Sequence, residues 1–204
     1  MIDQSCYPIT RPIRTTEPTA EQEPISLDEA RSQCGLVGNN AHDADLQGFI
    51  TSAREQVEND TGLVCYTGSF TWKLTDWPYE SWFEIRALRP VTAITSITYL
   101  DGSGATQTWA ASSYQLETST VVPLVRLTYA QSWPGDFRGD VNGITVTLVA
   151  GYASVEAVPQ RVKQAVRLAV HVLWLLKMED AAEAQKQQVA YDRQIWLLQR
   201  GSYP

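Results

Sequence analysis

The chain of 204 residues has few of the side chains that most often carry chemistry, with two histidines and three cysteines. The cysteines, Cys6, Cys34 and Cys65, are odd in number, widely spaced and form no CxxC pair, which argues against a disulfide framework and favours a reducing compartment. Together with His42 and His171 they show no spacing typical of zinc ligands. Most nucleophile–base pairs in enzymes also need a histidine. We therefore predict no metal, no cofactor and no enzymatic activity.

A basic excess and a long hydrophobic run are also missing. The chain has 16 Lys and Arg against 23 Asp and Glu, a formal net charge of -7, which disfavours binding to nucleic acid or to anionic membranes. The segment closest to a long apolar run, 169–176, contains His171 and is too short to span a bilayer. No basic segment followed by an apolar stretch opens the chain, so we expect no signal peptide. With 44% hydrophobic residues, most of the chain should fold.

Residues 1–24 contain four prolines (Pro8, Pro12, Pro18 and Pro24) and little apolar content. Proline at this density disrupts helices and sheet ladders, so we predict an extended N-terminal arm that is ordered only where something holds it.

Helical signals follow the arm. Ser26 and Glu29 have the spacing of a capping box, which predicts a short helix. A second helix should start at Asp43 or Asp45 and end at Gly62. Its apolar face is formed by five residues (Leu46, Phe49, Ile50, Ala53 and Val57), and three charged residues lie off that face (Arg54, Glu55 and Glu58). The two helices should form an antiparallel hairpin.

Between about residues 64 and 151 the chain is rich in Thr, Val, Ile, Tyr and Trp, and turn residues interrupt it. Alternation of apolar and polar residues over 70–74 predicts a half-buried strand. A turn at 101–104 predicts a hairpin between 94–100 and 106–109. Further strands are predicted at 114–117, 124–129 and 143–149. Short strands at this spacing indicate a small antiparallel or barrel-like β domain.

After Pro159 the helical period returns. The helix beginning near Val162 has two apolar stripes, so it should pack between neighbours on two sides. A last helix, 181–199, has a polar middle and an apolar end. The predicted fold class is α+β: a helical bundle made by the N-terminal hairpin and the C-terminal helices, with an inserted small antiparallel β domain. The predicted domains are the arm at 1–24, a discontinuous helical domain at 25–62 and 158–199, and the β domain at 63–157.

Several residues invite a functional interpretation, and each has a plainer one. His171 could serve a small hydrolase together with a nearby acid, but its place in the most apolar helix favours a structural role. His42 should be a solvated loop residue. The aspartates near 136–142 lack the register of a calcium loop and favour a solvated turn. The tryptophans at 72, 77 and 82 could stack sugars, but packing inside a β domain is favoured. Trp196 could be buried against a partner or against its own bundle.

Four sets of segments follow one another along the chain: Ile25–Arg31 with Asp43–Gly62; Arg89–Gly104; Tyr114–Leu116, Ser132–Pro134 and Val146–Tyr152; and Val158–Ala165 with the apolar helix after it. Read in this order, they resemble the phage head–tail adaptor family, also called connector or head-completion proteins. The resemblance covers roughly residues 25–178. The chain departs from the pattern at 176–179, where many relatives carry a Tyr and an Arg-Glu pair.

The resemblance implies a virion protein at the head–tail interface, made in the host bacterial cytoplasm. It would form a ring, expected to be dodecameric, below the portal, extend the DNA channel without binding DNA specifically, and offer a docking platform. Its expected partners are the portal protein, a stopper or tail-completion protein, and neighbouring copies of itself. Alternatives are a stopper or tail-completion protein of the same particle and, in another class, a carbohydrate-binding module.

The resemblance also directs attention to the two ends of the chain. We expect the C-terminal helix to face the portal through its apolar residues (Tyr191, Ile195, Trp196, Leu197 and Leu198). We expect the arm to contact a neighbouring subunit or the portal through three residues (Tyr7, Ile9 and Ile13). On this interpretation, removing residues 190–204 should leave a folded protein that fails to attach to capsids.

Overall fold

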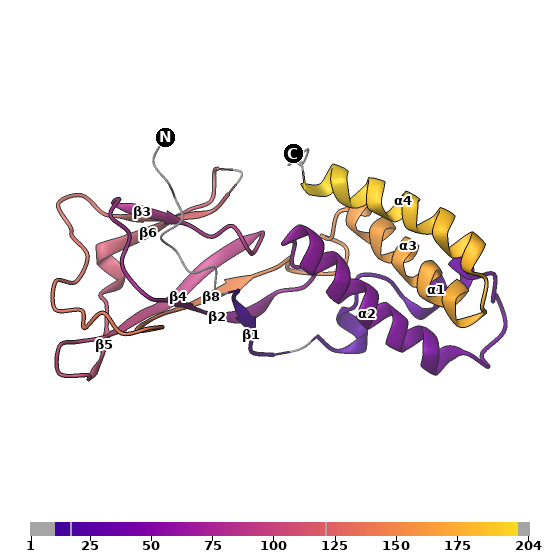
Figure 1. The fold of residues 1–204 in the computed structure, drawn as a ribbon, viewed down its shortest axis with the longest axis horizontal. Coiled ribbons are helices and arrows are strands. Elements are labelled where there is room, and N and C mark those ends of the chain that lie inside the picture. The colour runs from indigo at the N-terminus through magenta and orange to yellow at the C-terminus, as the bar shows by residue number, and fades with distance from the viewer. Residues whose placement is uncertain (1–10, 17, 121, 200–204) are drawn as a thin grey trace. The chain divides into compact units, whose positions relative to one another are not determined.

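The computed structural model describes residues 11–16, 18–120 and 122–199, which form two compact units (Figure 1). The β unit is formed by Gly68–Gly151 with the segment that precedes residue 18, and the helical unit by Pro18–Thr67 with the segment that follows Gly151. The chain is therefore α+β, which confirms the predicted class. None of the helices in this part of the chain is long and apolar enough to cross a membrane.

A five-stranded antiparallel sheet runs through the β unit in the order β1-β2-β8-β4-β5. The strands are β1 (Ile13–Arg14), β2 (Gly68–Leu74), β4 (Val91–Leu100), β5 (Thr106–Thr108) and β8 (Ile144–Ala150). In the central pair, Phe70 lies opposite Leu148 and Leu74 opposite Ile144. All four side chains are buried, because alternate residues of a strand point to the same face. The predicted alternation at 70–74 thus identifies the buried face.

A second, three-stranded antiparallel sheet has the order β3-β7-β6. Its strands are β3 (Trp82–Glu84), β6 (Tyr114–Glu117) and β7 (Leu124–Leu127), and a 3-10 turn, η2 (Ala111–Ser113), precedes β6. Ring contacts join the two sheets: the centroids of Trp72 on β2 and Phe83 on β3 are 5.8 Å apart. We did not predict β3, because three residues are too few to display a period.

The helical unit contains η1 (Ala20–Gln22), α1 (Leu27–Gln33), α2 (Asp43–Thr61), α3 (Gln160–Lys177) and α4 (Ala181–Gln199). The predicted capping box is present, with Glu29 N–H donating to the Ser26 hydroxyl at 3.2 Å and Ser26 N–H donating to the Glu29 carboxylate at 2.8 Å. Gly62 ends α2 in the left-handed conformation that glycine adopts without strain.

Helix α3 lies at the centre of this unit and contacts α1, α2 and α4, as its two apolar stripes predicted (Figure 1). Seven of its residues are buried (Val162, Ala165, Val166, Ala169, Val170, Val172 and Trp174). Leu176, which belongs to the second stripe, is 54% exposed, because it lies at the helix end, beyond the main contacts.

The segment predicted as one arm contributes to both units along its described residues. In the β unit, Ile13 and Arg14 pair with Thr71 and Phe70, and the Arg14 guanidinium lies 4.9 Å from the Phe70 ring centroid. In the helical unit, Glu23 is buried. Short contacts therefore hold these residues within their own chain.

Candidate functional site

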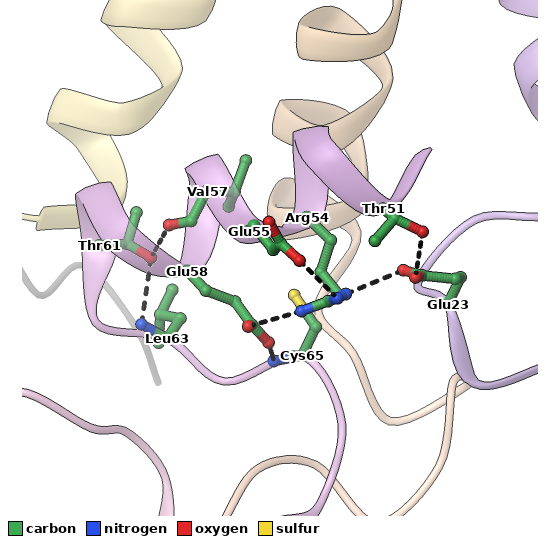
Figure 2. A network of polar contacts seen from close by, with 9 residues as sticks. All are labelled: Glu23, Thr51, Arg54, Glu55, Val57, Glu58, Thr61, Leu63 and Cys65. Carbon is green, nitrogen blue, oxygen red and sulfur yellow. Dashed lines mark hydrogen bonds and ion pairs between the residues drawn. The ribbon is translucent and has the colours of Figure 1, made fainter. Parts of the chain in front are cut away.

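The most buried charged group of the helical unit is Arg54, whose side chain is 1% exposed. Figure 2 shows its partners: Glu23, which precedes α1, Glu58, one turn further along α2, and the adjacent Glu55, which is exposed. Arg54 Nε donates to Glu23 Oε2 at 3.0 Å, and Nη1 donates to Glu58 Oε2 at 2.9 Å. Thr51 Oγ1 donates to the other Glu23 oxygen at 3.0 Å, and Cys65 N–H donates to the other Glu58 oxygen at 2.8 Å. Burial raises the pKa of Glu23, and Arg54 opposes that rise.

This network links the segment before α1 and the segment after α2 to α2 itself (Figure 2). Its carboxylate oxygens accept hydrogen bonds from protein donors, so they are engaged in holding the fold. A buried arginine with two carboxylates is also a site where loss of one partner is costly. The prediction that Arg54 lies off the core-facing side of α2 is therefore wrong at this position. The sequence carries no sign that Glu23, in a proline-rich segment, reaches it.

The two histidines take different places in the helical unit. His171 is half-buried on α3, and its buried Nδ1 has no hydrogen-bond partner. His42 was predicted to be a solvated loop residue, but it is half-buried, with its ring edge-on to Trp174 at 5.0 Å and its Nδ1 3.7 Å from Asp45. Across the parts of the chain that the structure describes, no group of three or more His, Cys, Asp or Glu could hold a metal ion.

The aspartates of the loop after β7 have protein partners. Tyr99 Oη donates to Asp136 at 3.0 Å, and the Arg138 guanidinium lies 3.2 Å from Asp140. Asn142 stands in the left-handed conformation of a turn. This arrangement is that of the predicted turn.

Two of the three tryptophans considered for sugar stacking, Trp72 and Trp77, pack against other aromatic rings of the β unit, and Trp82 is half-buried on β3. Trp72 is edge-on to Phe83, whereas Trp77 stacks on Trp133 with a centroid distance of 5.1 Å and an interplanar angle of 13°. Two rings this close leave no room for a sugar between them. Trp77 also contacts Trp109, so these rings form part of a packed cluster.

The C-terminal helix α4 buries most of the residues that were predicted to face the portal. Tyr191, Ile195 and Leu198 are at most 7% exposed and belong to the core, and Tyr191 Oη donates to Asp60 Oδ2 at 2.6 Å. Burial, with Asp60 nearby, raises the pKa of Tyr191. Removing residues 190–204, which we expected to leave the fold intact, would therefore delete three core side chains of the helical unit.

The surface of α4 that a partner could reach is smaller than the one predicted. Trp196 is 49% exposed and Leu197 is half-buried, because the helical period places them off the side of α4 that carries Tyr191, Ile195 and Leu198. Of the three arm residues, Ile13 is 72% exposed on β1, and Tyr7 and Ile9 lie outside the residues that the structure describes.

Two further exposed aromatic residues were not singled out in the sequence. Tyr79, in the loop between β2 and β3, and Tyr129, after β7, are 100% and 99% exposed. Nothing in the local pattern distinguishes them from the half-buried Tyr99, because exposure is decided by the packing of the loops.

No known family model matches this chain, and no curated protein matches it. The chain is similar to solved structures. One belongs to the "Virion of native gene transfer agent (GTA) particle", with a TM-score of 0.66 and 22% identity, covering 79% of this chain and 82% of the other. A second, from the "Neck of native GTA particle computed with C12 symmetry", has a TM-score of 0.64 and 21% identity, covering 79% and 81%. A third, from the "Neck of empty GTA particle computed with C6 symmetry", has a TM-score of 0.65 and 21% identity, covering 79% and 82%. At this identity the likeness establishes a shared fold.

Proposed function

We propose that this chain is a structural subunit in the neck of a tailed phage or a related gene transfer particle. It forms a dodecameric ring below the portal protein, as a head–tail adaptor. The ring extends the DNA channel and provides the docking platform for the stopper or tail proteins.

The observation that carries the proposal is the fold likeness to neck proteins, one of them from a neck computed with C12 symmetry. The likeness covers 79% of this chain and 81% of the other, so it extends well beyond a single shared motif. A closed ring of identical subunits forms when a head-to-tail contact closes by rotation, and it needs no catalytic group.

The charge of the chain fits a channel for DNA. With a formal net charge of -7, a ring of these subunits repels the phosphate backbone rather than gripping it. DNA can then pass without specific binding.

Within the proposed ring, the C-terminal helix contacts the portal through Trp196, supported by Leu197. Trp196 presents about half of a large aromatic side chain to solvent, and such residues often anchor protein interfaces. The buried Tyr191, Ile195 and Leu198 act indirectly, since they hold the helix against the bundle.

Electron cryomicroscopy of purified particles tests the ring. We expect twelvefold density between portal and tail that accommodates this fold, and tail-less filled heads when the gene is deleted. Normal tailed particles from the deletion strain would refute the proposal. A position further from the portal would identify the chain as the stopper or tail-completion protein instead.

The portal contact has its own test within the full-length chain. Trp196→Ser should reduce attachment to isolated heads, whereas Val189→Ser, which changes a 60% exposed residue on the same helix, should not. Equal attachment of both variants would show that Trp196 does not contact the portal.

A further inference from the structure

Two tyrosines in loops of the β unit, Tyr79 and Tyr129, are 100% and 99% exposed to solvent. A single exposed apolar residue is ordinary on a protein surface. Two fully exposed tyrosines on adjoining loops are less ordinary and indicate a binding surface, because tyrosine is enriched in protein interfaces and offers a large rigid contact area.

Hydrogen bonds join the two loops within the β unit. Leu127 N–H donates to the Ser81 carbonyl at 2.8 Å, and Trp133 Nε1 donates to the Glu80 carbonyl at 2.9 Å. The stack of Trp77 on Trp133 connects the same loops through their side chains. Each tyrosine therefore projects from a backbone that other contacts hold.

The loop of Tyr129 is additionally tied to η2. Thr128 N–H donates to the Ser113 carbonyl at 3.0 Å, and Gln131 N–H donates to the Thr128 carbonyl at 3.2 Å, which closes a tight turn with Tyr129 at its tip. Binding through residues that are already ordered avoids part of the entropy cost of association.

The two loops that carry the tyrosines contain more acidic than basic residues. Residues 75–81 and 128–142 contain four carboxylates, Asp76, Glu80, Asp136 and Asp140, and one basic residue, Arg138. Arg138 is paired with Asp140. The excess of negative charge favours a partner surface with positive charge.

We propose that Tyr79 and Tyr129, with Asp76, Glu80 and Asp136, bind the next protein along the neck. The partner surface presents Lys and Arg side chains around apolar pockets that accept the tyrosine rings. This inference rests on the proposed function and identifies the chemistry of the docking platform.

The experiment complements a particle-producing strain that lacks the gene with full-length variants. Tyr79→Ser, Tyr129→Ser and the double variant are compared with Val37→Ser, which changes an 80% exposed residue of the helical unit. Tailed particles are counted by electron microscopy, and the amount of this chain in each head is measured by immunoblot. Circular dichroism of each purified variant checks that its fold is unchanged.

We expect the double variant to give about tenfold fewer tailed particles, with this chain still present in the heads. Glu80→Lys should reduce tail attachment as well, and attachment in vitro should weaken as salt rises. Val37→Ser should behave as the unaltered chain.

The possible failures are distinguishable. Normal tail attachment by the double variant would overturn this inference and leave the neck assignment intact. Loss of the double variant from the heads would also overturn it, because the surface would then serve the portal side. Absence of the unaltered chain from particles would overturn the proposed function, and this inference with it.

Discussion

Replacing Arg54 by methionine should destabilise the helical unit strongly. Methionine is long and unbranched, so it fills much of the space of the arginine stem but removes the charge. Glu23 and Glu58, whose side chains are 7% and 14% exposed, would then lie next to each other without a cation. Breaking such a buried pair by removing one partner costs about 3–5 kcal/mol.

This loss is large compared with the stability of a typical domain, about 5–15 kcal/mol. With a urea dependence of about 2 kcal/mol per molar, the unfolding midpoint should fall by about 1.5–2.5 M. Urea unfolding of the full-length chain, followed by ellipticity at 222 nm, measures this shift, because the signal reports mainly on the helices.

Lys186→Met is the matched control in the same unit. Lys186 is 73% exposed and pairs with Glu183 at 2.8 Å on the surface of α4. Exposed pairs of this kind contribute about 0–1 kcal/mol. The control should therefore shift the midpoint by less than about 0.5 M.

The pH dependence separates lost charge compensation from lost packing. Burial already raises the pKa of Glu23, and without Arg54 the pKa should rise further. An acid whose pKa is raised on folding destabilises the folded state when ionised and ceases to do so as pH falls. The deficit of Arg54→Met should therefore be smaller at pH 5 than at pH 7.5. A loss below about 1 kcal/mol, or an equal deficit at both pH values, would refute the role assigned to Arg54.

Three other predictions test separate contacts. Removing residues 190–204 should abolish most of the helical ellipticity, because it deletes Tyr191, Ile195 and Leu198 from the core; a cooperatively folded truncated chain would contradict this. Tyr191→Phe should lower the free energy of unfolding by about 1–2 kcal/mol in a urea titration, through loss of the hydrogen bond to Asp60, and an unchanged midpoint would speak against that bond. Hydrogen bonds from Ser103 and Gln107 lower the pKa of Asp101 from 3.8 to about 2. The stabilisation of the folded state by the ionised Asp101 is therefore complete above pH 3.8 and is lost as the pH falls through 2. Asp101→Asn should flatten the acid unfolding curve in that interval, and an unaltered curve would count against this contribution.

The order of the elements could be predicted from the sequence because it depends on local periodicity. The alternation over 70–74, the helical stripe from Leu46 to Val57 and the capping box of Ser26 each concern residues a few positions apart. The structure places elements at all three. The predicted boundaries differ from the observed ones by a few residues at most strands, since strand ends are decided by pairing with partners.

The candidate surfaces were predictable only in part. An apolar cluster at Ile195–Leu198 identified a helix that must bury something, but not against what. The structure buries Ile195 and Leu198 in the helical core and leaves Trp196 half-exposed. The helical period allows one side of α4 to be buried and the other exposed, and the position of α3 decides which side is buried.

The sequence by itself determined which segments are helical and which are extended. Only the tertiary structure decided that Arg54 is buried and that Tyr79 and Tyr129 are fully exposed. The reason is that periodicity reports on neighbours along the chain, whereas the burial of a charge depends on partners far away. Glu23 reaches Arg54 across 31 positions, and no local pattern encodes that contact.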